Sequence, residues 1–366
     1  MPFDATLYTR AQAIRTGADA SGRSARGLLR WWRTPLWLFA LATGAKSFAD
    51  NPILGSRRLN HAGLHVWRLK SAHVLAAWRR KRLARGVPAE LKHEFDRDGF
   101  VVVPEVIPPD QFESFRSAIL DADLDCRSHQ QGDTITTRMP VGPELLRRVP
   151  ALASLLESAR WKGLMAYVAS TQAEPLYYVQ AISGGVAEGP ADPQLELHSD
   201  TFHPSLKAWL FLTDVPGDGR PLTYVAGSHR LSSERLAWEK RRSIEIAAAD
   251  RLSQRGSLRI RPQELSGLDL PQPTHFAVPA NTLVVADTCG FHARAGSERP
   301  TLRIEIWAYS RRSPFLPWTG FDLLSWRPFA VRRAEWLGRL IDWLDRRGWK
   351  KQQWRSAGAW RQAISR

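Results

Sequence analysis

The chain has 366 residues, of which 43% are hydrophobic and 10% aromatic, so it can bury a sizeable core and is not a disordered or fibrous protein. Its two cysteines, Cys126 and Cys289, are too few for a disulfide framework or a cysteine-based metal site, and they favour a reducing compartment. The formal net charge is +16, and it is unevenly distributed along the chain.

The positive charge is concentrated at the two ends. Residues 1–89 contain 16 Lys and Arg against 3 Asp and Glu, and residues 311–366 contain 13 against 4. The remaining residues, 90–310, therefore carry a net charge of −6. This division predicts three segments with these bounds, in which the basic ends serve something other than the chemistry of the acidic middle.

The N-terminal segment shows neither a signal peptide nor a membrane span. Residues 1–10 lack a basic start followed by an apolar run, and the most apolar stretch, residues 35–45, has about half the length that a spanning helix needs. We therefore expect a cytoplasmic protein. The Arg-rich, acid-poor start also fits an organellar transit peptide, and that alternative stays open.

Basic and aromatic residues occur at roughly helical spacing in residues 28–33, 35–41 and 76–82, where the middle stretch is apolar and the two others carry the Arg and Lys. Such a segment can lie in the headgroup region of an anionic membrane, or it can pack its Trp face on the main domain and solvate its Arg face. A similar helix is predicted over residues 331–349, with the same two interpretations. Interleaved Trp and Arg also bind nucleic acid, but no nucleic-acid module accompanies them, so we expect no nucleic-acid partner.

The compact domain begins near residue 88 with helical and then β-like sequence. We predict helices over residues 88–95, 111–121 and 151–170, the second of them with Asp110 as its N-cap. A set of short, apolar runs separated by turn residues then predicts strands at residues 100–104, 176–180, 207–212, 222–225, 275–278, 282–285 and 302–307. Short strands with long insertions favour a barrel or jelly roll over a parallel sheet.

The strongest candidate site is His198-Ser199-Asp200. In extended chain, residues i and i+2 point to the same side, so an imidazole and a carboxylate can converge on one metal ion. With His292 as third ligand, two imidazoles and one carboxylate would occupy one face of an octahedron and leave three positions for cosubstrate, O2 and water. A single His-x-Asp occurs often by chance, so this pattern needs support from elsewhere.

Arg303 provides that support because it lies in a predicted strand, eleven residues beyond His292. A buried Arg needs an anionic partner. Its planar guanidinium suits a carboxylate, such as the distal carboxylate of 2-oxoglutarate.

Three parts of the chain together resemble the phytanoyl-CoA dioxygenase superfamily, over about residues 90–310. The first is the helix, Asp-Gly-Phe turn and strand of residues 95–104, with the helix start at 109–112. The second is His198-Ser199-Asp200 with the strand, turn and Gly-Ser-His that follow, and the third is His292 with Arg303. The resemblance implies an α+β fold: a double-stranded β-helix (jelly-roll, cupin-like) core, flanking helices, and basic helical N- and C-terminal extensions.

The resemblance also implies an activity and a set of site residues. His198, Asp200 and His292 would bind Fe(II), Arg303 would bind the distal carboxylate of 2-oxoglutarate, and Gln180 would line the cosubstrate pocket. The protein would then be an O2-consuming dioxygenase that hydroxylates a C–H bond of a small-molecule or lipid-linked substrate and releases succinate and CO2. Halogenating relatives replace the carboxylate ligand with Gly or Ala, so Asp200 favours hydroxylation or another oxidation.

Several alternatives stay open. The domain can be a catalytically silent β-helix that binds a membrane or a partner, or the same site can hold Zn or Mn. Arg294 departs from the family, which often has Ser or Gly there. We expect His229 to close a turn and Cys289 to pack in the core. His203 could lie beside the metal ligands without binding the metal. Tyr177, Tyr178 and Lys207 could either line the pocket or lie in the core or at its rim. The substrate is expected to be chosen by loops at residues 126–145, 182–197 and 230–272.

Overall fold

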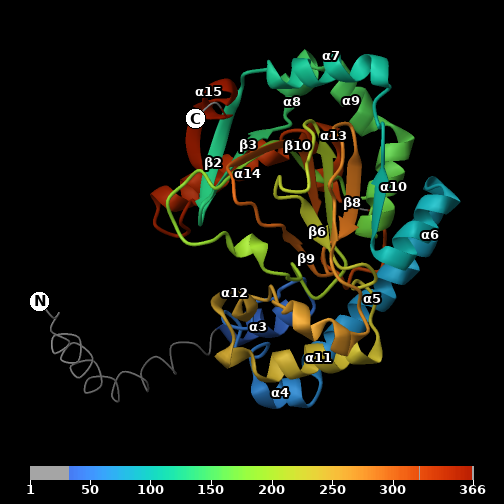
Figure 1. The fold of residues 1–366 in the computed structure, drawn as a ribbon. Helices are drawn as coiled ribbons and strands as arrows, with labels where there is room; N and C mark the ends of the chain where they lie inside the picture. The colour runs from blue at the N-terminus through green and yellow to red at the C-terminus, as the bar shows by residue number, and fades with distance from the viewer. Residues whose placement is uncertain (1–32, 321, 365–366) are drawn as a thin grey trace, which may run out of the picture.

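The computed structural model describes residues 33–320 and 322–364, which form two facing β-sheets with helices around them (Figure 1). The larger sheet is antiparallel, in the spatial order β1-β8-β5-β10-β4-β3-β2-β11. Its strands are β1 (Phe100–Val103), β2 (Asp125–Gln131), β3 (Thr134–Pro140), β4 (Leu176–Gly184), β5 (Leu206–Phe211), β8 (Leu283–Asp287), β10 (Thr301–Ser310) and β11 (Arg355–Ala359).

The smaller sheet contains β7 (Thr274–His275), β6 (Leu222–Tyr224) and β9 (His292–Arg294) in that order. It packs on one face of the larger sheet, which we call the inner face, through a cluster that includes Trp209 and Trp307 from the larger sheet and Tyr224 and Phe276 from the smaller one. Alternate residues of a strand share a face, so β5 and β10 each present a row of large side chains inward. This two-sheet arrangement is the expected jelly-roll core.

Helices cover the outer face of the larger sheet: α6 (Ala89–Asp98), α7 (Pro109–Leu120), α8 (Pro143–Arg148), α9 (Pro150–Glu157) and α10 (Ala159–Ala169). The helix expected over residues 151–170 is in fact two helices. Ser158 between them is extended (φ −63°, ψ 142°), and its Oγ accepts a hydrogen bond from Trp161 N at 3.3 Å. The Ser therefore caps α10, and the apolar periodicity continues across the break.

The N-terminal elements are α3 (Thr34–Leu41), α4 (Arg57–His61) and α5 (Leu64–Leu83). Figure 1 shows α3 and α4 below the sheets, beside α11 (Ser233–Ile244) and α12 (Arg251–Gln254). Short 3-10 turns also occur in the described residues, at η2 (Ala84–Gly86), η3 (Pro193–Leu195), η4 (Ile246–Ala248), η5 (Pro262–Glu264), η6 (Ser266–Leu268) and η7 (Leu323–Ser325).

Helix α5 is joined to the main domain by buried guanidinium groups. Arg79 donates hydrogen bonds to the carbonyl oxygens of Ser170, Pro314 and Leu316 at 2.7–3.0 Å. In contrast, α3 has no buried residue. Most of the basic segment expected at residues 28–33 lies outside the described residues.

The C-terminal elements are α13 (Arg327–Ala330), α14 (Arg333–Arg346), β11 and α15 (Trp360–Ile364). The segment was expected to be helical, and it also contributes β11, which pairs with β2 at the edge of the larger sheet. Trp360 is fully buried in the main core. The C-terminal segment is thus packed on the domain, and α14 lies over the inner face near β4.

Strands β2 and β3 form a hairpin within the range that we expected to be a variable loop, residues 126–145. Its sequence is mostly polar, so the apolar pattern that marks a strand is weak there. Among the described residues, no helix is both long enough and apolar enough to span a membrane.

Candidate metal centre

The two predicted histidine ligands lie opposite one another on paired backbone. His198 N donates to His292 O at 3.0 Å, and His292 N donates to His198 O at 2.9 Å. Residues paired in this way project their side chains to the same side of the sheet. Asp200, two residues after His198, joins them, and one ligand atom from each residue lies within 4.8 Å of the others.

Backbone carbonyl groups orient both imidazoles for metal binding. His198 Nδ1 lies 2.7 Å from Glu196 O and His292 Nδ1 lies 3.0 Å from Gly290 O, so each Nδ1 carries the proton and each Nε2 keeps a lone pair. Nε2 of His292 is buried and has no hydrogen-bond partner among the described residues. Burial lowers the pKa of His292 to about 4 and lowers that of His198 well below its ordinary value, so both rings are neutral ligands at neutral pH.

The carboxylate of Asp200 is also ready to bind a cation. Burial raises the pKa of Asp200, but the ammonium of Lys207 and the two imidazoles outweigh it, and the net pKa lies well below the ordinary range. Lys207 Nζ lies 2.6 Å from Asp200 Oδ2. The donor set, two neutral imidazoles and one ionised carboxylate, therefore fits Fe(II) or a similar divalent metal ion.

A second cation lies beside the same aspartate. Lys46 donates to the backbone oxygen of Asp200, and burial lowers the pKa of Lys46 to about 8. The three candidate ligands, Lys46 and Lys207 all line one cavity of about 300 Å³. Gln180, Arg303 and Arg294 also line the cavity. The structure therefore brings together all five predicted site residues, which are the three candidate ligands, Gln180 and Arg303.

Arg303 is buried, but the chain itself supplies an anionic partner for it. Arg303 Nε donates to Glu305 Oε2 at 2.8 Å, and Nη1 donates to Arg220 O at 2.8 Å. The expectation that a buried Arg here requires an external anion is therefore not compelling, because Glu305 is fully buried beside it. Arg303 still lines the cavity and can present the rest of its guanidinium to a ligand.

Gln180 belongs to the same network. Its Nε2 donates to Glu305 Oε1 at 2.6 Å, and its Oε1 accepts from Arg138 Nε at 2.6 Å. The Arg138 guanidinium carbon lies 4.0 Å from the ring centre of Trp307 and 4.4 Å from that of Trp354. Gln180 thus connects the guanidinium of Arg138 with the carboxylate of Glu305 in the cavity wall.

Arg294, the departure from the family pattern, is a cavity residue. Its Nη1 donates to Asp192 Oδ2 at 2.7 Å, and Asp192 is buried. Burial lowers the pKa of Arg294, although the carboxylate of Asp192 opposes this effect. The ion pair therefore fixes Arg294 in the wall next to the metal ligands.

The other histidines do not join the metal ligands. His203 is buried and does not line the cavity. His229 packs under the Asp98-Gly99 turn. Gly99 has φ +84°, and a Cβ there would lie 2.4 Å from His229 Nδ1. The Asp-Gly-Phe and Gly-Ser-His segments therefore meet in space, and His229 has the structural role that we expected.

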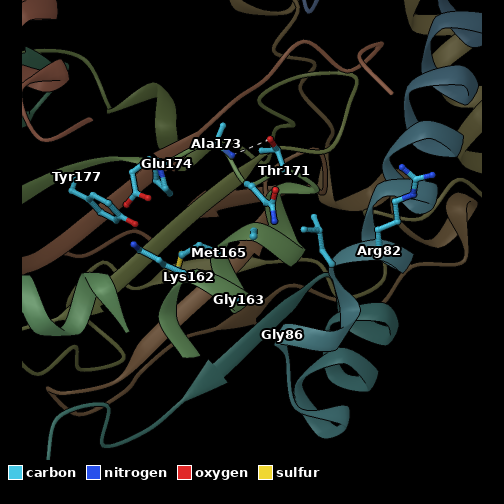
Figure 2. A pocket seen from close by; sticks show the side chains of 13 residues that line it. Arg82, Gly86, Lys162, Gly163, Met165, Thr171, Ala173, Glu174 and Tyr177 are labelled. Atoms are coloured by element: carbon cyan, nitrogen blue, oxygen red, sulfur yellow. Dashed lines mark hydrogen bonds between the residues drawn. The ribbon is translucent and has the colours of Figure 1, made fainter. Parts of the chain in front are cut away.

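Of the remaining candidates, Lys207 lines the metal cavity, whereas Cys289 is buried in the protein interior. Tyr178 lines a neighbouring cavity and Tyr177 lines a more distant one. The latter cavity, of about 380 Å³, lies between the end of α5, α10 and the loop before β4 (Figure 2). It shares no lining residue with the metal cavity, so it is not part of the candidate centre.

Sequence reasoning missed Glu305, Arg138 and Lys46 as residues of the site. Glu305 and Arg303 are two apart in one strand, so their common face was predictable from the spacing. Lys46 lies far outside the jelly-roll segment, and no local pattern connects it with Asp200.

No curated protein matches the chain. Among solved structures, it is similar to the 2-oxoglutarate-dependent epimerase SnoN from nogalamycin biosynthesis, with a TM-score of 0.38 and 18% identity over 64% of this chain and 90% of that one. It is also similar to HygX from Streptomyces hygroscopicus with nickel, 2-oxoglutarate and hygromycin B bound (TM-score 0.36, 17% identity, 65% and 92% covered). A third is EctD from S. alaskensis with bound Fe (TM-score 0.36, 18% identity, 61% and 76% covered).

The sequence itself matches a family model. The model is described as phytanoyl-CoA dioxygenase (PhyH), and it matches residues 95–264. That range includes His198 and Asp200 and ends before His292 and Arg303, which the fold brings back to the same cavity. Through residues 95–264, the chain is similar to the phytanoyl-CoA dioxygenase family.

Proposed function

We propose that the protein is an Fe(II)- and 2-oxoglutarate-dependent dioxygenase that hydroxylates a C–H bond of a small-molecule substrate, and that residues 90–310 carry this chemistry. The observation that supports it most is the group of His198, Asp200 and His292 in one cavity with Arg303. With iron and 2-oxoglutarate bound, such a site couples oxidative decarboxylation to succinate and CO2 with oxidation of a second substrate by O2.

In this proposal each residue has a defined task. His198, Asp200 and His292 hold the metal ion through two Nε2 atoms and a carboxylate oxygen. Arg303 binds the distal carboxylate of 2-oxoglutarate, and Glu305 holds the guanidinium in place through Nε. Gln180 keeps Glu305 in position by donating to its other oxygen. The smaller sheet and the aromatic rows of β5 and β10 exclude water from this end of the cavity.

The first test is turnover without added substrate. Protein purified anaerobically receives Fe(II) and 2-oxoglutarate, then O2, and succinate is followed. We expect succinate from the wild type and from His275→Ala, which changes an exposed histidine on β7. His198→Ala should lose at least about a hundredfold of the rate, as expected for a missing metal ligand.

Several outcomes would count against an Fe(II)-dependent oxygenase. Succinate that does not depend on His198 would remove the metal centre from the reaction. Absence of both succinate and the metal-to-2-oxoglutarate charge-transfer band would favour the silent β-helix domain. Succinate formation with Mn(II) but not with Fe(II) would favour Mn as the metal, and tight binding of Zn(II) without succinate formation under any metal would favour a zinc site.

We further propose that the basic, Trp-rich ends make a peripheral contact with anionic membrane, as expected for a protein that meets a lipid-linked substrate. Helix α3 supports this, because Leu36, Leu38 and Phe39 are 60%, 53% and 69% exposed. Arg57 and Arg58 are exposed on α4, the next helix in the chain. Exposed apolar side chains together with arginines suit the headgroup region of an anionic bilayer.

Vesicle sedimentation tests this contact. We expect wild-type protein to bind phosphatidylglycerol-containing vesicles more tightly than pure phosphatidylcholine vesicles. The double variant Leu36→Ser, Phe39→Ser should bind at least about tenfold more weakly, because it removes two inserted apolar side chains. Val186→Ser, an exposed apolar residue between the two basic ends, is the control. Equal binding of wild type and double variant would refute the contact through α3.

A further inference from the structure

A second cavity lies beside the metal cavity, between α14 and the inner face of the larger sheet. It has a volume of about 580 Å³. Its floor comes from β2, β3, β4 and β10, and its roof comes from α14, with apolar side chains such as Leu145, Leu176, Leu337 and Ile341. The roof helix α14 and the other C-terminal residues that line this cavity, Gln352, Trp354 and Ser356, lie outside the matched family domain.

The two cavities are neighbours that share part of their walls. Arg138, Trp307, Tyr309 and Trp354 line both of them. The Arg138 guanidinium carbon lies 4.0 Å from the ring centre of Trp307 and 4.4 Å from that of Trp354, so these three side chains pack together where the two cavities adjoin. Trp354 comes from the C-terminal segment, so that segment supplies both the roof and one of the side chains that line both cavities.

The roof is held in place by polar contacts to β2. Arg127 Nη1 donates to Asp342 Oδ1 at 2.9 Å and to Trp354 O at 3.2 Å. Gln352 Nε2 also donates to Asp342 Oδ1, at 2.8 Å. These contacts connect α14 and the chain before β11 to the same strand, so the cavity is a built part of the fold.

The metal cavity has an excess of positive charge. Six cationic side chains line it: Lys46, Arg138, Lys207, Arg294, Arg303 and Arg311. Three have carboxylate partners, namely Asp200 for Lys207, Asp192 for Arg294 and Glu305 for Arg303. Within the described part of the chain, Lys46, Arg138 and Arg311 form no ion pair with a carboxylate.

Cofactors would leave this excess unchanged. A divalent metal ion adds two positive charges and 2-oxoglutarate adds two negative ones, so the three unpaired cations remain for the second substrate. A cavity lined by cations concentrates anionic ligands. Tyr309, which lines the apolar cavity as well, lies two residues before Arg311, at the end of β10.

We propose that the cavity under α14 is a substrate subsite, which takes the apolar chain or ring system of an organic anion while its charged group lies near Lys46 and Arg311. The bond that is oxidised then lies between the two ends, next to the metal ligands. This proposal rests on the proposed function only in taking the metal cavity as the place of reaction. Its binding step is measurable without turnover.

The test uses butyl, hexyl and octyl phosphate as probes. Their dissociation constants for the full-length protein are measured by calorimetry, with and without Fe(II) and 2-oxoglutarate under anaerobic conditions. Each buried methylene should tighten binding by up to about fourfold, so octyl phosphate should bind at least about thirtyfold more tightly than butyl phosphate. Octyltrimethylammonium, which has the same chain and the opposite charge, should bind at least about tenfold more weakly than octyl phosphate.

Gly338→Leu fills the subsite from the roof. Gly338 lines the cavity, and a Cβ there would meet only the Arg127 side chain, at 3.5 Å and beyond, which is ordinary contact. Leu also has a higher helix propensity than Gly, so α14 should form normally. We expect octyl phosphate to lose at least about tenfold in affinity and butyl phosphate to be little changed. Leu340→Trp on the same helix is the control, because Leu340 is 51% exposed and does not line the cavity.

The charged end has its own variant. The double variant Lys46→Gln, Arg311→Gln should weaken all three phosphates by a similar factor, about tenfold, and should leave the dependence on chain length intact. If Gly338→Leu fails to fold, as judged by near-UV circular dichroism, Ile341→Trp fills the same cavity.

The proposal is overturned if butyl and octyl phosphate bind equally well to the wild type. It is also overturned if a folded, filled variant keeps the wild-type chain-length dependence, or if the ammonium probe binds as tightly as the phosphate. Absence of both succinate and the metal-to-2-oxoglutarate charge-transfer band, together with chain-dependent phosphate binding, would refute the oxygenase and leave the subsite standing.

Discussion

At the scale of single residues, Lys207 gives the metal centre an unusual electrostatic environment. Its ammonium lies 2.6 Å from Asp200 Oδ2, and both side chains are largely buried, at 17% and 24% exposure. The lysine keeps the carboxylate ionised, and it also repels any divalent cation that binds there. These two effects on metal affinity oppose each other. At neutral pH an aspartate is ionised even without a neighbouring lysine, so the direct repulsion is the larger effect.

Replacing Lys207 with Met should therefore tighten metal binding. At an effective dielectric constant of about 20, the repulsion between charges about 5 Å apart amounts to several kcal/mol, so we expect at least about a tenfold gain in affinity. Isothermal titration with Mn(II) at pH 7, without 2-oxoglutarate, measures it. Lys207→Arg keeps the charge and should bind like the wild type. An unchanged or lower affinity of the Met variant would show that Lys207 instead organises the ligand.

The Arg303–Glu305 pair gives a second prediction at this scale. Glu305→Gln leaves the guanidinium buried without its carboxylate, which should cost about 3–5 kcal/mol in the free energy of unfolding. Urea unfolding measures this loss. Glu113→Gln, at an exposed pair on α7, should leave the urea midpoint nearly unchanged.

The same variant reports on the cosubstrate site. If Arg303 binds the distal carboxylate of 2-oxoglutarate, that carboxylate partly replaces the missing Glu305. The cosubstrate should then raise the melting temperature of Glu305→Gln more than that of the wild type. A rise of equal size in both proteins would place the distal carboxylate elsewhere in the cavity.

At the scale of elements, α5 connects the basic N-terminal segment to the jelly-roll domain. Arg79 crosses from this helix to the end of α10 and to the chain after β10, with hydrogen bonds to three carbonyl groups. A guanidinium that satisfies several buried carbonyls is costly to remove, because each of them loses its donor. The helix is therefore part of the folded unit, although its sequence resembles that of a solvated basic arm.

Arg79→Ala should lower the free energy of unfolding by about 3 kcal/mol or more. The matched control is Arg82→Ala on the same helix, where the guanidinium is exposed and lies 3.4 Å from the ring centre of Trp78. That variant should lose less than about 1 kcal/mol. Chemical denaturation followed by tryptophan fluorescence compares the two, and equal losses would argue that α5 is not fixed by Arg79.

At the scale of the whole molecule, buried histidines make the fold sensitive to acid. Burial lowers the pKa of both His203 and His229 to about 3. In the unfolded chain each has its ordinary pKa near 6.5, so between these values the unfolded state binds more protons than the folded state. Their neutral forms therefore contribute full stability above about pH 6.5, and this contribution falls as the pH falls towards 3.

Between about pH 6.5 and pH 3, we expect each of these two histidines to lower the free energy of unfolding by up to about 4 kcal/mol. Urea unfolding at pH 7.5, 6.5, 5.5 and 4.5 should show stability falling with pH. In His229→Gln the decline should be shallower by about 1.4 kcal/mol for each pH unit below 6.5, because one titrating group is gone. A variant with the wild-type slope would mean that His229 does not titrate with unfolding.

Some features were predictable because they depend on local spacing. His198 and Asp200 are two apart in extended chain, so their side chains had to share a side, and the same rule placed Arg303 with the side chains of β10. Short apolar runs identified most strands of the core. We did not predict the polar hairpin of β2 and β3, because it is covered by α14 and β11, which lie more than 190 residues later in the chain.

The amino-acid sequence by itself determined the local ligand pair, the jelly-roll strands and the uneven charge, because each depends on neighbours within a few residues. Only the tertiary structure decided that His292 pairs with His198, that Lys46 reaches Asp200, and that α14 roofs a second cavity. These contacts join distant segments, and they exist because the two sheets and the terminal helices bury their apolar faces together.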